Sequence, residues 1–252
     1  DDKNKLLSHV LYVDFDKDFE EILRVSPKEV ISLGKLGAFD EHGIFPLNVY
    51  KDKDRILGYT TGWNRKVSVS ADASIGFAQS FDNGETFEKY GTGPILTSSL
   101  NEPFLVGDAF VTKFNDDKYH MWYIYGIRWI EDEKSGVSER VYKIAYADSI
   151  DGINWNRDSK CIIPDVIDEN ECQALPTVIF YENRYHMFFT YRNAIGFRTN
   201  KKNSYRIGYA YSDDMKNWVR DDEHVGIKLS DSGWDSEMMC YPFVFHCDHN
   251  IY

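Results

Sequence analysis

One stretch of this sequence, Tyr205–Trp218, reads Y-R-I-G-Y-A-Y-S-D-D-M-K-N-W, and altered copies of it occur twice upstream. The copies are Lys143–Trp155 (K-I-A-Y-A-D-S-I-D-G-I-N-W) and Ser74–Phe87 (S-I-G-F-A-Q-S-F-D-N-G-E-T-F). In each copy, small or polar residues alternate with aromatic ones, a turn rich in Ser, Asp and Gly follows, and an aromatic residue ends the pattern. The alternation predicts a half-buried strand, and the Ser, Asp and Gly residues predict a tight turn into a second strand.

The terminal aromatic residues of the three copies set a repeat length. Phe87 and Trp155 lie 68 positions apart, and Trp155 and Trp218 lie 63 positions apart. A four-stranded antiparallel sheet fits that length, and repeated sheets of this kind are typical of a β-propeller. We therefore predict an all-β propeller built of four-stranded antiparallel blades.

Length and composition fit one large all-β domain. The 252 residues are 42% hydrophobic and 15% aromatic, which is enough to bury a core and excludes disorder. The formal charge of −12 argues against nucleic acid or an anionic membrane as a partner, because both attract basic surfaces. A neutral ligand such as a sugar is compatible with this charge. The oligomeric state stays open.

The sequence contains four cysteines, Cys161, Cys172, Cys240 and Cys247. They are too few for disulfide bonds to stabilise a chain of this size. No Cys-x-x-Cys pair occurs, which argues against a structural zinc site. We interpret the four as mostly buried thiols in a reducing compartment, which favours the cytoplasm. Neither an apolar run of about 18 residues nor a signal peptide is visible. Export stays open, because a protein whose signal peptide has been removed would look the same.

We expect a single propeller domain over residues 1–252. Within it we expect N-terminal strands in 1–37, blade repeats in about 38–104, 105–170 and 171–236, and a partial blade in 237–252. The first strands of the units are expected at Ile44–Tyr50, Val106–Phe114, Ala174–Phe180 and Cys240–Phe245. The fourth strands are expected to end in Gly93–Leu96, Cys161–Pro164 and Val225–Ile227. Because the sequence stops within a hairpin and an open stack of blades leaves exposed edges, we expect the natural protein to continue.

Acidic residues recur at the starts of the first strands. In three units a glutamate stands five residues before a proline, and these pairs are Glu41 with Pro46, Glu171 with Pro176, and Glu237 with Pro242. Asp40 adjoins Glu41, and Asp108 begins the first strand of the second unit. Since first strands line the central channel of a propeller, these acids are expected to converge there.

Converging carboxyl groups suit glycosidic chemistry. One carboxylic acid protonates the leaving oxygen, while a carboxylate attacks carbon or activates water. Crowding among several acids would raise the pKa of one of them, which then becomes the proton donor. The alternative for any single acid is a turn former or a solvated strand end.

The ends of the second strands supply a further set of candidate binding residues. They read Trp63-Asn64-Arg65, Gly126-Ile127-Arg128-Trp129 and Tyr191-Arg192-Asn193. Aromatic faces stack on sugar rings, and Arg or Asn donors bind hydroxyl, carboxylate or phosphate groups. The substrate-binding candidates are therefore Glu41, His42, Trp63, Arg128, Trp129, Arg192 and Glu237. Packing between blades is the alternative for Trp129, and a structural hydrogen bond is the alternative for His42.

One turn has a recognisable architectural motif. Ser80–Phe87 fits S-x-D-x-G-x-x-aromatic, the Asp box of sialidases and other propellers, whose side chains satisfy the backbone of the turn. The sequence has no Walker loop, dinucleotide fingerprint, G-x-S-x-G or H-E-x-x-H motif. We therefore predict neither a cofactor nor a metal site.

These features together resemble the five-bladed propeller glycosidases of glycoside hydrolase families 43 and 32, with family 130 as a cousin. The resemblance covers roughly Leu33 to the end. It is carried by Phe39–Pro46 (F-D-E-H-G-I-F-P), Gly107-Asp108-Ala109, Glu171-Cys172, Tyr205–Trp218 and Gly233–Met238 (G-W-D-S-E-M). The resemblance implies a five-bladed propeller in an uncharacterised, hydrolase-like branch.

The resemblance also implies catalytic roles. It suggests Asp40 as nucleophile or base, Asp108 as the residue that steadies the transition state, and Glu171 as proton donor. The first-blade Asp-Pro pair and the second-blade Arg-Asp-Pro motif of those families are missing, so Glu41 competes with Asp40. The function implied is a glycoside hydrolase acting on an oligosaccharide or other glycoside. The alternatives are a non-catalytic carbohydrate-binding propeller, with its acids in salt bridges, and a glycoside phosphorylase or transferase.

Overall fold

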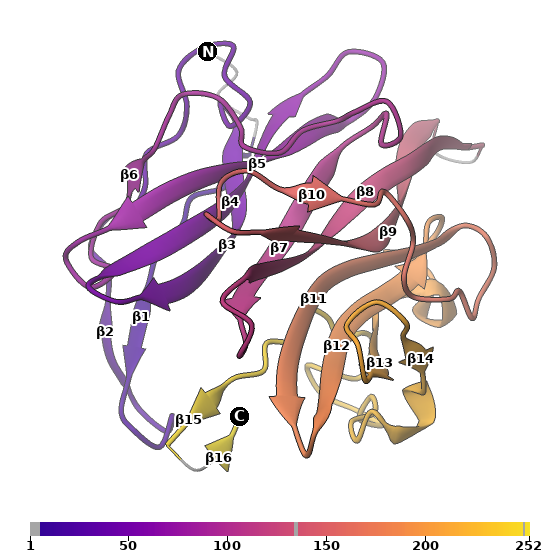
Figure 1. Ribbon diagram of the computed structural model, residues 1–252. Helices are drawn as coiled ribbons and strands as arrows, with labels where there is room; N and C mark the ends of the chain where they lie inside the picture. The colour runs from indigo at the N-terminus through magenta and orange to yellow at the C-terminus, as the bar shows by residue number, and fades with distance from the viewer. Residues whose placement is uncertain (1–5, 134–135, 249) are drawn as a thin grey trace.

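The structure of the protein is a computed structural model that describes residues 6–133, 136–248 and 250–252. It contains three four-stranded antiparallel sheets and two two-stranded hairpins (Figure 1). The predicted all-β propeller of four-stranded antiparallel blades is confirmed. The short 3-10 helices η1 (Lys201–Asn203) and η2 (Asp222–His224) are the helical elements of the described residues.

The three sheets follow one another along the sequence, and we number them blades 1 to 3. Blade 1 contains β3 (Gly43–Asp52), β4 (Arg55–Arg65), β5 (Ala71–Ser80) and β6 (Glu88–Lys89). Blade 2 contains β7 (Val106–Lys113), β8 (Tyr119–Asp132), β9 (Val137–Ser149) and β10 (Asn156–Arg157). Blade 3 contains β11 (Glu171–Tyr181), β12 (Arg184–Asn193), β13 (Arg206–Ser212) and β14 (Val219–Arg220). In each blade the strands pair in sequence order, and the first strand β7 of blade 2 contacts the first strands β3 and β11 of its neighbours.

Two hairpins lie where the N-terminal and C-terminal segments meet in space. They are formed by β1 (Val13–Phe15) with β2 (Ile22–Val25), and by β15 (His246–Cys247) with β16 (Asn250–Ile251). Figure 1 shows them side by side, and Phe19 bridges them with ring centroids 5.6 Å from Phe245 and 4.9 Å from Tyr252. Aromatic packing therefore joins the two terminal segments.

Two strand predictions were wrong. The fourth strands follow directly on the terminal aromatic residues of the turns, at Glu88, Asn156 and Val219, and do not reach the predicted end segments. The predicted strand Cys240–Phe245 is not a regular strand, and two of its N–H groups bond to side chains instead of a neighbouring strand. Tyr241 donates to Thr190 Oγ1 (2.8 Å) and Val244 donates to Thr177 Oγ1 (3.2 Å).

Each of the first strands is interrupted at the same place. A β-bulge occupies Phe45–Pro46 in β3, Asp108–Ala109 in β7 and Leu175–Pro176 in β11. Asp108 and Leu175 adopt left-handed backbone conformations, with φ of 52° and 46°, and so does Tyr241 in the fourth unit, with φ of 65°. A non-glycine residue held there signals local strain, which concentrates at functional sites. The N–H of Asp108 is fixed by Thr61 Oγ1 of the preceding blade, at 2.7 Å.

The core lies between adjacent blades. One cluster joins blades 1 and 2 through residues such as Tyr59 and Met121, and another joins blades 2 and 3 through Trp122 and Met187. Met121 and Met187 stand at the same position of the repeated Tyr-His-Met segment and both have 0% exposure. Burying such a side chain contributes about 1.5–3 kcal/mol. The repeat therefore marks the contact surface between blades.

The three turns between third and fourth strands are built alike. A serine hydroxyl donates to an aspartate two residues later, at 2.8 Å in Ser80–Asp82, 3.0 Å in Ser149–Asp151 and 3.1 Å in Ser212–Asp214. Each aspartate also accepts backbone N–H groups of its own turn. Hydrogen bonds from Thr86 lower the pKa of Asp82 to about 2. These acids stabilise turns, as the Asp-box pattern predicts.

Candidate functional site

The predicted site residues gather at one end of the blades. Antiparallel pairing puts the starts of the first strands, the ends of the second strands and the starts of the third strands at this end. We call it the upper face, since β7 and β11 run from it toward the lower part of Figure 1. Asp40, Asp108 and Glu171 all belong to this end, at or near the starts of β3, β7 and β11.

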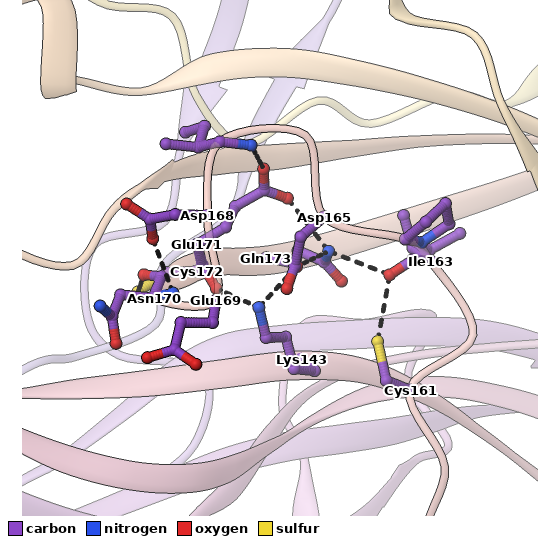
Figure 2. Close-up of polar contacts among 12 residues, drawn as sticks. Lys143, Cys161, Ile163, Asp165, Asp168, Glu169, Asn170, Glu171, Cys172 and Gln173 are labelled. Carbon is purple, nitrogen blue, oxygen red and sulfur yellow. Dashed lines mark hydrogen bonds and ion pairs between the residues drawn. The ribbon is translucent and has the colours of Figure 1, made fainter.

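The carboxylate of Glu171 is enclosed, with 0% exposure. Figure 2 shows the segment before it looping around its side chain. Glu171 Oε2 accepts the N–H groups of Val166 and Ile167, both at 3.0 Å. Glu171 Oε1 accepts Gln173 Nε2 at 3.1 Å and pairs with Arg220 Nη1 at 2.5 Å. Four donors therefore saturate this carboxylate.

The surroundings of Glu171 are an extended polar network. Arg220 also pairs with Asp222 at 2.9 Å and lies against Tyr191, with 4.4 Å between guanidinium carbon and ring centroid. From blade 2, the buried Lys143 donates to the Glu171 carbonyl at 2.7 Å and pairs with Asp165 at 2.5 Å (Figure 2). The network thus ties blade 2 to blade 3.

Asp40 is held in a similar way in blade 1. Its side chain is almost fully buried and pairs with Lys89 Nζ of β6 at 2.5 Å. A Cβ added to Gly34 would lie 2.1 Å from Asp40 Oδ1, so the carboxylate rests directly on the glycine backbone. Glycine is needed at position 34 because any side chain would displace Asp40.

Blade 2 contains an equivalent pair that sequence reasoning missed. Glu102, with 0% exposure, pairs with Arg157 Nη1 of β10 at 2.5 Å and accepts a short hydrogen bond from Tyr123 Oη. The three cations occupy one register, opposite a buried alanine of the third strand, in the pairs Lys89 with Ala78, Arg157 with Ala147 and Arg220 with Ala210. We call each acid and its fourth-strand cation a blade clasp.

A sequence signal for the clasps existed. In every repeat the cation stands two residues after the terminal aromatic residue, as F-E-K ending at Lys89, W-N-R ending at Arg157 and W-V-R ending at Arg220. The acids are harder to find because the loops before the first strands differ in length. Alignment on the prolines put Glu41 level with Glu171, whereas the clasp uses Asp40.

Asp108 differs from both clasp acids. It lies within the β7 bulge and is half-buried, and no cation of the described residues forms an ion pair with it within 4 Å. Loss of hydration raises its pKa to about 6, although the N–H of Leu175 and the charge of Arg140 act in the opposite direction. Asp108 can therefore exchange a proton in the pH range where glycosidases commonly need an acid.

The neighbours of Asp108 come from several blades. Tyr241 packs edge-on against Phe45 (5.8 Å between ring centroids) and against Tyr205 (5.7 Å). Burial, the neighbouring Tyr205 and, to a smaller extent, Asp108 raise the pKa of Tyr241. The same bulge position is occupied by Phe45, Asp108 and Tyr241 in their respective units. Asp108 is the acid among these three residues.

β4 separates Asp40 from Asp108. Thr61 accepts the Asp108 N–H, while a Cβ on Gly62 would lie 2.5 Å from Asp40 Cβ. Consecutive residues of a strand face opposite sides of a sheet. Asp40 and Asp108 therefore lie against opposite faces of blade 1, and no contact among the described residues joins two of the three predicted catalytic carboxyls.

The first-blade binding candidates lie together at the upper face. His42 stacks on Trp63 with ring centroids 6.1 Å apart, and its Nδ1 accepts the Arg65 N–H at 3.3 Å. Trp63 Nε1 donates to Ser8 Oγ at 3.3 Å. Glu41 accepts the Gly37 N–H at 2.8 Å and lies 3.9 Å from His42 Nε2. All three candidates are half-buried.

The remaining candidates have different surroundings. Arg128 donates to Asn170 Oδ1 and to the Glu169 carbonyl, both at 2.8 Å, and so fastens the loop before β11. Trp129 packs against the cluster between blades 2 and 3. Glu237 is exposed, and Arg192 is fully buried.

The structure also bears on the predictions about cysteines, metal ligands and membrane spans. Cys172 is buried, whereas Cys161 and Cys240 are exposed and Cys247 is half-buried, so the prediction of mostly buried thiols was wrong. Across the part of the sequence that the structure describes, no group of three His, Cys, Asp or Glu side chains converges as metal ligands would. Nor does any described helix have the length and apolarity to cross a membrane.

The fold is that of the β-propeller glycosidases. The protein is similar to a solved structure of a complex of BT0996 and RGII, with a TM-score of 0.69 and 16% identity over 95% of this sequence and 71% of that one. It is similar to another described as "Glycoside hydrolase", with a TM-score of 0.68 and 17% identity over 90% and 68% of the two sequences. A thermostable family-43 glycoside hydrolase matches with a TM-score of 0.58 and 14% identity over 83% and 63%. At these identities the likeness concerns the fold.

The sequence relatives define the family more narrowly. The uncharacterised proteins MT1551 and Rv1502 from two strains of Mycobacterium tuberculosis are each 31% identical to this protein over 229 residues. The match covers 91% of this sequence and 71% of each relative. The protein therefore belongs to the same family as these two. No protein-family model matches it.

Proposed function

We propose that this protein is a carbohydrate-active enzyme that cleaves a glycosidic bond at its upper face, with Asp108 as the proton donor. The fold supports a carbohydrate as ligand, because solved neighbours described as glycoside hydrolases share it. The observation that carries the proposal is the state of Asp108, whose pKa is raised to about 6 and which no ion pair with a described residue neutralises. A carboxyl group in that state is protonated in mildly acid solution and can donate to a leaving oxygen.

The proposed roles differ from those that the family resemblance implies. Glu171 would have to break four hydrogen bonds, one of them to Arg220, before it could donate a proton. Asp40 is buried in its ion pair with Lys89 and lies against the opposite face of blade 1 from Asp108, so we assign it a positioning role. Glu171 is then a positioning residue that fixes the start of β11.

The test compares isosteric variants on a panel of aryl furanosides and pyranosides. Asp108→Asn should lower kcat by 100-fold or more and remove the limb of the pH–rate profile near pH 6, since general acid catalysis contributes about 10²–10⁴-fold. Glu171→Gln should lower activity only in proportion to the loss of folded protein, measured by circular dichroism. A fully active Asp108→Asn variant would eliminate the proposal.

A specific observation favours a second candidate function, a sugar-binding propeller without catalysis. Two of the three predicted catalytic acids, Asp40 and Glu171, are buried in ion pairs, as that alternative expects. Calorimetric titration with a glycoside panel separates the two candidates. Sugar binding without turnover by the wild type, unchanged in Asp108→Asn, would establish the second one.

A further inference from the structure

The arginine side chains fall into two groups. Seven of the eleven arginines form an ion pair with a carboxylate, and these are Arg24, Arg55, Arg128, Arg157, Arg184, Arg198 and Arg220. Arg65, Arg140, Arg192 and Arg206 have no carboxylate of the described residues within 4 Å. The protein has 41 acidic and 29 basic residues, so a shortage of acids does not explain these four cations.

All four of these arginines belong to the upper face. Arg65 ends β4, Arg140 lies near the start of β9, Arg192 is the penultimate residue of β12, and Arg206 begins β13. These are the ends of second strands and the starts of third strands, the same end of the blades where the first strands begin. The face that holds Asp108 thus also holds the four arginines that have no carboxylate partner among the described residues.

Arg192 is the most unusual of the four, because its side chain is fully buried. Its Nη2 donates to Tyr142 Oη at 2.9 Å, and its Nη1 donates to the carbonyls of Asn193 and Ala194. Its guanidinium carbon lies 3.6 Å from the centroid of the Phe197 ring. Arg192 Nε is buried without a hydrogen-bond partner among the described residues. A buried cation normally needs an anion or full hydrogen bonding, and within the described residues this one has neither.

Arg140 lies two residues before Tyr142 in β9. It is half-buried, and among the described residues its guanidinium makes one long hydrogen bond, from Nη1 to Ser70 Oγ at 3.4 Å. Arg192 and, more weakly, Arg140 both oppose the rise in pKa that burial imposes on Tyr142, and both act on Cys172 in the same direction. Arg140 also acts on Asp108. Both arginines therefore act electrostatically on Tyr142, and Arg140 also acts on the proposed proton donor.

We propose that the upper face binds a sugar carrying an anionic oxygen group, a carboxylate or a phosphate, which Arg140 contacts directly and Arg192 supports through its positive field. This inference rests on the proposed function, since it names the class of substrate at that site. Guanidinium groups match carboxylate and phosphate oxygens through paired N–H donors. The bound anion would also lie near Asp108, where a like charge favours the protonated carboxyl and so the proton donor.

The test measures dissociation constants by calorimetry for a panel of hexuronate oligosaccharides, their neutral methyl esters and inorganic phosphate. The wild type should bind a hexuronate or phosphate, and should bind the free acid at least tenfold more tightly than its ester. Arg140→Gln should abolish that preference by weakening binding of the free acid to the level of the ester. Arg184→Gln is the matched control, because Arg184 is half-buried like Arg140 but lies at the opposite end of the blades, in an ion pair with Asp213.

The outcomes separate this inference from the proposed function. Equal affinity of the wild type for acid and ester, or an intact preference in Arg140→Gln, would overturn the anionic ligand. Cleavage of neutral glycosides without binding of any hexuronate or phosphate would also overturn the anionic ligand, but it would support the proposed glycosidase activity. Phosphate binding alone, lost in Arg140→Gln, would support the anion site and assign it to phosphate. A protein that neither binds nor cleaves any member of the panels would contradict both proposals.

Discussion

Glu171 and Asp108 are acids of neighbouring first strands, and they have opposite environments. Glu171 is fully buried, yet Arg220 and three other donors compensate its charge. Asp108 retains some exposure, yet no ion pair with a described residue compensates it, and its pKa rises to about 6. Burial alone therefore does not decide what a carboxyl group can do.

The comparison separates two kinds of acid at the upper face, those that recur in every blade and one that does not. The clasps at Asp40, Glu102 and Glu171 recur in the same register in three blades, as expected of an element that closes each blade. Asp108 has no acidic counterpart at the bulge position of blades 1 and 3, where Phe45 and Leu175 stand. Repetition is typical of architecture, and the acid that does not repeat is the one to which we assign the proposed chemistry.

The largest expected effect comes from opening a clasp. Glu171→Ala should lower the free energy of unfolding by about 3–5 kcal/mol, because it leaves Arg220 buried with only Asp222 as partner. Urea denaturation monitored by tryptophan fluorescence measures the change. Glu169→Ala is the control, since Glu169 pairs with Arg128 at 3.4 Å but its side chain is 79% exposed, and it should change stability by less than about 1 kcal/mol.

A double variant sharpens this prediction. Glu171→Leu combined with Arg220→Met removes both charges, so it should recover part of the stability lost in Glu171→Ala. If Glu171→Ala proved as stable as Glu169→Ala, the clasp would not stabilise the fold. The role of proton donor that the family resemblance implies for Glu171 would then regain support.

A smaller effect of opposite sign is expected at Asp108. Its pKa is higher in the folded protein than in the unfolded state, so the folded state loses stability as pH rises from about 4 to 6. Asp108→Asn should remove this loss and raise the free energy of unfolding at pH 7 by about 1–2 kcal/mol, after allowance for the partial exposure. Thermal unfolding of both proteins at pH 4 and pH 7 measures this change in stability. If Asp108→Asn were less stable than the wild type at pH 7, the conclusion that no ion pair compensates Asp108 would be refuted.

The sequence predicted the architecture because the repeat is local. Tyr205–Trp218 and its two copies each specify a strand, a turn and a packed aromatic residue, and these survive in β5, β9 and β13 with their turns. The strand predicted at Cys240–Phe245 failed because strand formation needs a pairing partner, and this segment bonds to Thr177 and Thr190 side chains.

The site was harder to predict from sequence, for a physical reason. Residue type and offset from a proline cannot tell whether a carboxylate will meet a cation from a strand about 50 residues away, as Asp40 meets Lys89 and Glu171 meets Arg220. Glu102 was missed because no proline follows at the matching place in its unit. Asp108 was found, but its left-handed bulge is fixed by Thr61 of another blade, and its raised pKa comes from loss of hydration in the folded protein.

The smallest expected effect separates two adjacent acids that the sequence left in competition. Glu41 is half-buried, and its carboxylate accepts one N–H, from Gly37, which a glutamine oxygen can accept equally well. Glu41→Gln should therefore change the free energy of unfolding by less than about 1 kcal/mol. Asp40→Asn weakens the buried pair with Lys89 and should cost several times more in the same urea titration. The difference is expected because Asp40 forms the buried ion pair of the clasp and Glu41 does not. Equal costs for the two variants would therefore mean that blade 1 is not stabilised by a clasp in the way proposed for blades 2 and 3.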